Sequence, residues 1–129
     1  MDADRTMRDS RISAAGAFLA ALGVGLGAFG AHAMKARLGP AALGWWETAV
    51  QYQMWHAIAL VALGAFGGER MRRPAWLLAT GTIAFSGSLY IMALTEARWL
   101  GAVTPVGGVL MISGWLLAAW RLIRVAPAG

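Results

Sequence analysis

Residues 12–34 read ISAAGAFLAALGVGLGAFGAHAM, and no Asp, Glu, Lys or Arg interrupts them. A helix needs about 20 mainly apolar residues to cross the roughly 30 Å hydrocarbon core of a bilayer. The stretch is long enough, so it predicts a membrane-spanning helix. An alternative is a secretory signal peptide, because residues 31–33 (Ala-His-Ala) fit the small-x-small cleavage pattern. We favour a retained helix, since the apolar region of a signal peptide has only about 7–15 residues.

Three further apolar blocks follow, at about residues 43–66, 75–94 and 104–123. Loops with glycine, proline and charged residues separate the blocks. The last block opens with Thr104 and Pro105, which are typical of a helix N-cap and of the first helical position. The pattern predicts an all-α fold, an integral membrane bundle of four transmembrane helices that forms a single domain over residues 1–129.

The composition of the chain agrees with this prediction. Of the 129 residues, 59% are hydrophobic and 13% are charged, so a soluble monomer would have too few charges to cover its surface. The absence of cysteine excludes disulfides, thiolate metal sites and cysteine nucleophiles. The net charge of +5 comes from basic residues between apolar blocks, so we expect no nucleic-acid partner.

The distribution of Lys and Arg predicts the orientation of the bundle. Eight of them lie in the N-terminal segment, in the loop before residue 75 and in the C-terminal tail, which share one side in a four-span topology. Only Lys35, Arg37 and Arg98 lie on the other side. The positive-inside rule therefore places both termini in the cytoplasm. Tryptophans are expected at the inner interface (Trp76, Trp120) and at the outer one (Trp45, Trp46, Trp99).

The first block is rich in glycine and alanine. Gly23 and Gly27 are four residues apart, and small residues at this spacing let two helices approach closely in lipid. The spacing leaves open whether the partner is another helix of this chain or a second subunit. The packing positions expected over the whole chain are Gly16, Ala20, Gly23, Gly27, Gly30, Gly107 and Gly114.

The second block holds many polar residues for a transmembrane helix. Thr48, Tyr52 and His56 recur every four residues, so they share one helix face. Polar groups in lipid need partners and tend to face the bundle interior. One interpretation is a polar cavity that opens outward, and the other, which we favour, is hydrogen bonding between the second and third spans that fixes their packing. The candidate residues are Glu47, Thr48, Gln51, Tyr52, Gln53, His56, Thr82, Ser86 and Tyr90.

The sequence contains no recognisable catalytic constellation. His32 and His56 would suit a haem with two histidine ligands, but their expected depths in the two spans differ by up to ~15 Å. We therefore expect no cofactor, no metal and no catalytic residue, which makes an enzyme the least supported class.

Several segments resemble the family known as domain of unknown function 423. They are residues 27–35 (GAFGAHAMK), 47–57 (ETAVQYQMWHA), 85–90 (FSGSLY), 104–108 (TPVGG) and 114–115 (GW). The similarity covers about residues 12–122, and the second segment is quite specific. The resemblance implies a small multi-pass protein of the bacterial cytoplasmic (inner) membrane with four helices and mitochondrial relatives. It implies no activity.

Two functional hypotheses follow. The leading one is an accessory, assembly or scaffolding subunit that packs through its small-residue faces, as a homo-oligomer or in a larger membrane complex. The other is a site for an ion or a small ligand, such as a quinone or a lipid headgroup, in the polar cavity of the second span. The lipid bilayer is a partner in both, and the sequence does not identify a ligand.

Overall fold

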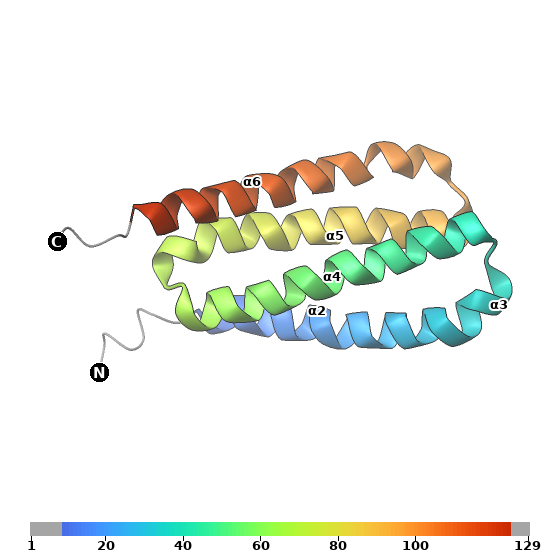
Figure 1. The fold of residues 1–129 in the computed structure, drawn as a ribbon, viewed down its shortest axis with the longest axis horizontal. Coiled ribbons are helices and arrows are strands. Elements are labelled where there is room, and N and C mark those ends of the chain that lie inside the picture. Colours follow the sequence, from blue (N-terminus) through green and yellow to red (C-terminus); the bar gives the residue numbers. More distant parts are fainter. Residues whose placement is uncertain (1–8, 125–129) are drawn as a thin grey trace.

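The computed structural model describes residues 9–124, which are almost entirely helical. Four long helices lie side by side and alternate in direction, so that α2 begins and α6 ends at the same end of the bundle (Figure 1). The long helices are α2 (Ser10–Phe29), α4 (Pro40–Phe66), α5 (Arg72–Thr95) and α6 (Thr104–Ile123). Short elements connect them, namely the π-helix η1 (Gly30–Met34), α3 (Lys35–Arg37) and the 3-10 helices η2 (Glu69–Met71) and η3 (Arg98–Ala102).

Three helical segments are long and apolar enough to cross a membrane. They are Ser10–Arg37, Glu69–Thr95 and Arg98–Ile123. The remaining long helix, α4, has 27 residues and a length of ~40 Å at 1.5 Å per residue. Its mean hydropathy is lowered by the polar run between residues 47 and 56.

The helix ends follow from local sequence. Asp9 caps α2, because its carboxylate accepts hydrogen bonds from the backbone N–H groups of Arg11 and Ile12. Pro40 occupies the first turn of α4, where its missing N–H leaves no helical bond unmade. Thr104 is already the first residue of α6, and its hydroxyl lies 2.6 Å from that of Ser88 instead of capping the helix as predicted.

The long helices pack mainly in series. Helix α2 lies against α4, α4 against α5, and α5 against α6, whereas α2 and α5 touch only lightly. One buried cluster still receives side chains from all four helices, with Ile12, Leu60, Leu78 and Met111 among them. The light contact between α2 and α5 leaves a groove along that side of the bundle.

Glycine permits the closest helix approaches. A Cβ atom on Gly16 would lie 2.7 Å from the carbonyl oxygen of Ala57 and from the backbone nitrogen of Val61, so α2 and α4 could not pack this closely with any larger residue. The glycine-rich face of α2 is therefore occupied within the chain. Of the other predicted packing positions, Gly23, Gly27 and Gly30 also face α4, Gly107 and Gly114 face α5, and Ala20 is half-buried.

Most arginines cluster at one end of the bundle, where α2 begins and α6 ends. The described arginines there are Arg11, Arg70, Arg72, Arg73, Arg121 and Arg124. Arg5 and Arg8, which were also counted for the orientation, lie outside the described residues.

Candidate functional site

The candidate polar residues lie in different places instead of around one outward-opening cavity. Helix α4 presents its own candidate residues to different neighbours, because residues three or four positions apart share a face while adjacent ones do not. Glu47 and Gln51 are exposed beside the end of α2, and Thr48 is half-buried. Tyr52 and His56 face α5 and α6. The groove between α2 and α5 is lined by the remaining candidates, Gln53, Thr82, Ser86 and Tyr90.

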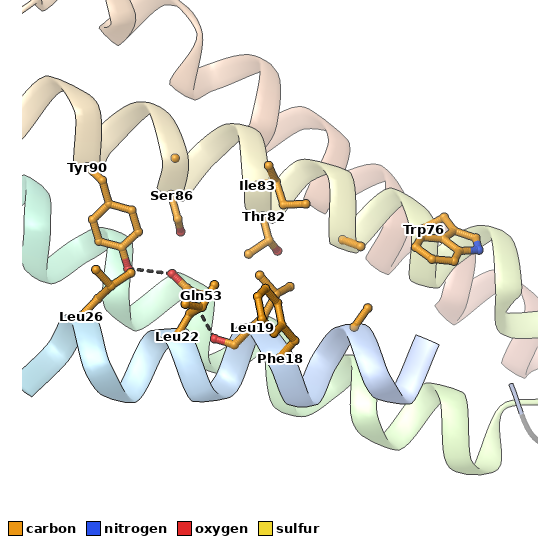
Figure 2. Close-up of a pocket in the computed structure, with 13 residues that line it drawn as sticks. Phe18, Leu19, Leu22, Leu26, Gln53, Trp76, Thr82, Ile83, Ser86 and Tyr90 are labelled. Atoms are coloured by element: carbon orange, nitrogen blue, oxygen red, sulfur yellow. Dashed lines mark hydrogen bonds between the residues drawn. The ribbon is translucent and has the colours of Figure 1, made fainter. Parts of the chain in front are cut away.

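Gln53 of α4 links three helices. Its Nε2 donates a hydrogen bond of 2.8 Å to the carbonyl oxygen of Leu19 in α2, and its Oε1 accepts one of 2.7 Å from the hydroxyl of Tyr90 in α5 (Figure 2). The side chain is only 4% exposed, and each end of its amide has a partner. A buried amide satisfied in this way holds α2, α4 and α5 in register.

The two remaining polar side chains of the groove are also bonded. Ser86 donates a hydrogen bond of 2.8 Å to the carbonyl oxygen of Ala49, which joins α5 to α4. Thr82 donates one of 2.7 Å to the carbonyl oxygen of Leu78 in its own helix, as hydroxyl residues in transmembrane helices commonly do. The α4–α5 contact therefore contains the kind of interhelical hydrogen bonding that the sequence predicted.

His56 is buried and has a partner at each ring nitrogen. Trp115 of α6 donates its indole N–H to Nε2 over 3.0 Å, and Nδ1 lies 2.8 Å from the carbonyl oxygen of Tyr52. Because Nε2 accepts, Nδ1 carries the hydrogen and donates to the carbonyl. No nitrogen lone pair remains for an iron, and His32 is exposed on η1. Among the described residues, no group of three or more His, Asp or Glu side chains is placed to hold a metal ion.

The groove between α2 and α5 has a volume of about 440 Å³ (Figure 2). Its walls are mainly apolar, with Phe18 and Leu22 on α2 and Ile83 on α5. Trp76 lies at one end and Tyr90 toward the other. Phe18 and Ile83 are both more than half exposed, so the described chain leaves the groove open to the surrounding lipid.

The outward side of α2 carries a stripe of small residues, bordered by the larger exposed side chains of Phe18 and Val24. The small residues recur every three or four positions and are exposed, and we call them the small-residue face of α2 (Ala14, Ala17, Ala21, Gly25, Ala28). At Gly25 no described atom lies within 4 Å of the place where a Cβ would be. Large side chains cover the outward face of α6, where Val109, Ile112 and Leu116 are more than 60% exposed. The regular spacing of small residues was visible in the sequence, but only burial distinguishes this face from the glycine-rich face that packs on α4.

Trp46 corrects one prediction from the sequence. It was expected at the outer interface, but it is 3% exposed and donates its indole N–H to the carbonyl oxygen of Leu26 over 2.9 Å. Gly30 makes room for the ring, since any Cβ there would overlap the indole. Trp115, the partner of His56, was missed, although an indole N–H in apolar surroundings needs an acceptor and so signals a buried contact.

A family model described as "Protein of unknown function (DUF423)" matches residues 26–108 of this chain. The chain belongs to the DUF423 family. The resemblance inferred from its motifs is therefore confirmed. The matched region contains Gln53, His56 and Tyr90, whose hydrogen bonds join the helices of this DUF423 protein.

Relatives of this DUF423 chain are named as membrane proteins. The UPF0382 membrane protein SH2409 of Staphylococcus haemolyticus is 47% identical over 79% of this chain and 86% of its own length. The UPF0382 membrane protein YwdK of Bacillus subtilis is 43% identical over 84% and 93%. The UPF0382 inner membrane protein YgdD of Escherichia coli K12 is 40% identical over 82% and 84%. No solved structure matches the chain. The protein is thus a membrane protein with transmembrane helices, and the names of its relatives give no activity.

Proposed function

We propose that this DUF423 protein is a non-enzymatic accessory or assembly subunit that binds another transmembrane helix through the small-residue face of α2. One observation carries this proposal, namely that this stripe of alanine and glycine is exposed and lies opposite the face that packs on α4. Helices in lipid associate by close backbone packing, which small residues permit. The partner is either a second copy of this chain or a helix of another membrane protein.

In this proposal the chain is one transmembrane domain with four spans, in the bacterial cytoplasmic (inner) membrane, with both termini in the cytoplasm. The length of α4 supports a fourth span, as do the internal partners of Gln53 and His56, which remove the main cost of placing polar groups in lipid. The arginines at the end where α2 begins support the orientation.

A ligand or ion site among the polar residues of α4 has less support. The polar atoms of Gln53 and His56 are bonded inside the bundle, so a role in helix packing accounts for both. Glu47 and Gln51 are exposed at the outer half of α4, and neither has a described hydrogen bond that would orient it toward a ligand.

The assembly proposal is tested by particle mass. The chain is extracted from membranes in polymer-bounded lipid discs, and the protein mass per disc is measured for the wild type, for Gly25→Leu and for Ser113→Leu, a matched change on the outward face of α6. We expect the protein mass per disc to exceed the 13.6 kDa of one chain for the wild type and for Ser113→Leu. For Gly25→Leu we expect the mass of one chain that is still folded. A single chain per disc in all three would contradict the proposal.

A further inference from the structure

The groove between α2 and α5 meets a polar cavity at the end of the bundle where α2 begins. Trp76 of α5 lines both. The polar cavity also has a volume of about 440 Å³, and the other residues that line it are Asp9, Ser10, Arg11 and Arg72. The apolar groove and the polar cavity, which we call the mouth, are therefore joined at Trp76. Tryptophan favours the level of lipid headgroups.

The mouth carries more positive than negative charge available to a ligand. One carboxylate oxygen of Asp9 caps α2, and the other lies 3.1 Å from Nε of Arg72, so the charge of Asp9 is largely engaged within the chain. Arg72 also lies 3.5 Å from Glu69, but its side chain is still 52% exposed. Arg11 adds a second exposed arginine to the same cavity. Two guanidinium groups at this position suit a phosphate.

The groove has the length and lining of an acyl-chain site. From Trp76 to Tyr90 helix α5 rises by ~21 Å, which exceeds the ~15 Å depth of one leaflet's half of the hydrocarbon core. Its walls are apolar, and the bonded pair of Gln53 and Tyr90 lies near its far end. A helix is about 10 Å across, and it would not enter a groove whose two wall helices touch each other.

We propose that this groove and mouth bind an anionic phospholipid, with one acyl chain between α2 and α5 and the phosphate at Arg11 and Arg72. The lipid comes from the leaflet at the end of the bundle where α2 begins. This site goes beyond the assembly role, because the groove is lined by Phe18, Leu22 and Leu26 and not by the small-residue face of α2.

The chain offers a variant that fills the groove without disturbing the fold. Gly87 lines the groove, and no described atom lies within 4 Å of the place where its Cβ would be. A leucine at this position enters open space and also favours the helix. Ala15→Leu fills the groove from the opposite wall and serves as a second variant. Ser113→Leu, on the outward face of α6, is the matched control.

The test is native mass spectrometry of the full chain in mild detergent, titrated with dioleoylphosphatidylglycerol or dioleoylphosphatidylcholine. We expect the wild type and Ser113→Leu to bind phosphatidylglycerol at least tenfold more tightly than phosphatidylcholine. Gly87→Leu and Ala15→Leu should lose tight binding of both lipids. Arg11→Gln and the double variant Arg11→Gln/Arg72→Gln should reduce the preference for the anionic lipid. The proposal is overturned if both leucine variants bind phosphatidylglycerol like the wild type, if the arginine variants keep the preference, or if Gly87→Leu changes the mass of the assembly.

Discussion

The indole N–H of Trp115 on α6 donates a hydrogen bond of 3.0 Å to Nε2 of His56 on α4. Helix α6 packs mainly on α5, so this bond ties it to a helix that is not its principal neighbour. The same bond makes Nδ1 the donor to the carbonyl oxygen of Tyr52. His56, which the sequence analysis gave as a candidate site residue, thus links α4 to α6 in this structure.

Replacing Trp115 by phenylalanine should destabilise the bundle by about 1–3 kcal/mol, because it leaves a buried nitrogen of His56 without a partner. The measurement is the free energy of unfolding in mixed micelles as denaturing detergent is added. Trp99→Phe is the control, since Trp99 is 72% exposed. Equal losses in the two variants would show that the bond to His56 contributes nothing specific.

The pair formed by Gln53 and Tyr90 should show energetic coupling. Gln53→Leu and Tyr90→Phe each remove one partner, and the double variant should be less destabilised than the sum of the two single variants by about 0.6–1.7 kcal/mol, the range of hydrogen bonds between transmembrane helices. The same unfolding measurement completes this double-mutant cycle. Strict additivity would mean that the 2.7 Å bond does not stabilise the contact of α4 and α5.

Two glycines of α2 should respond in opposite ways to leucine. Gly16→Leu would force apart the backbones of α2 and α4 and should lower stability by about 3 kcal/mol or more. Gly25→Leu points into open space and should leave the melting temperature of the single chain unchanged. Thermal melting in detergent compares them, and a similar loss at both positions would contradict the assignment of the two faces.

The four-span topology can be tested with single cysteines, because the natural chain has none. In intact cells an impermeant maleimide should label Gly39→Cys, in the loop before α4, and should label Arg124→Cys only after lysis. If α4 did not cross the membrane, α6 would end on the outer side. Labelling of both Gly39→Cys and Arg124→Cys in intact cells would therefore refute the fourth span.

The sequence predicted the helices well and the partners of their side chains poorly. The length of an apolar block and the turn residues around it predict where a helix begins and ends, since both are local features of the sequence. Whether Gln53 meets Tyr90, or His56 meets Trp115, depends on which neighbour covers each face of α4, and helical periodicity does not contain that information. The same limit explains Trp46, whose burial depends on the space left by Gly30 on another helix.

The outward face of α2 shows this limit most clearly. Ala21 and Gly25 have the same four-residue spacing as Gly23 and Gly27, so both pairs match the pattern for close helix contact. Only the position of α4 shows that one pair is used inside the chain and the other is free to contact a partner.

Photocrosslinking in native membranes tests the central claim most directly. A photoreactive amino acid is placed singly at positions along the small-residue face of α2, at Phe18 and Leu22 on its groove side, and at Ile112 on α6. We predict one discrete protein adduct, identified by mass, that recurs at Ala14, Ala17, Ala21, Gly25 and Ala28 and is absent at Phe18, Leu22 and Ile112. Lipid adducts alone at all positions, or protein adducts of equal yield on every face, would contradict the account.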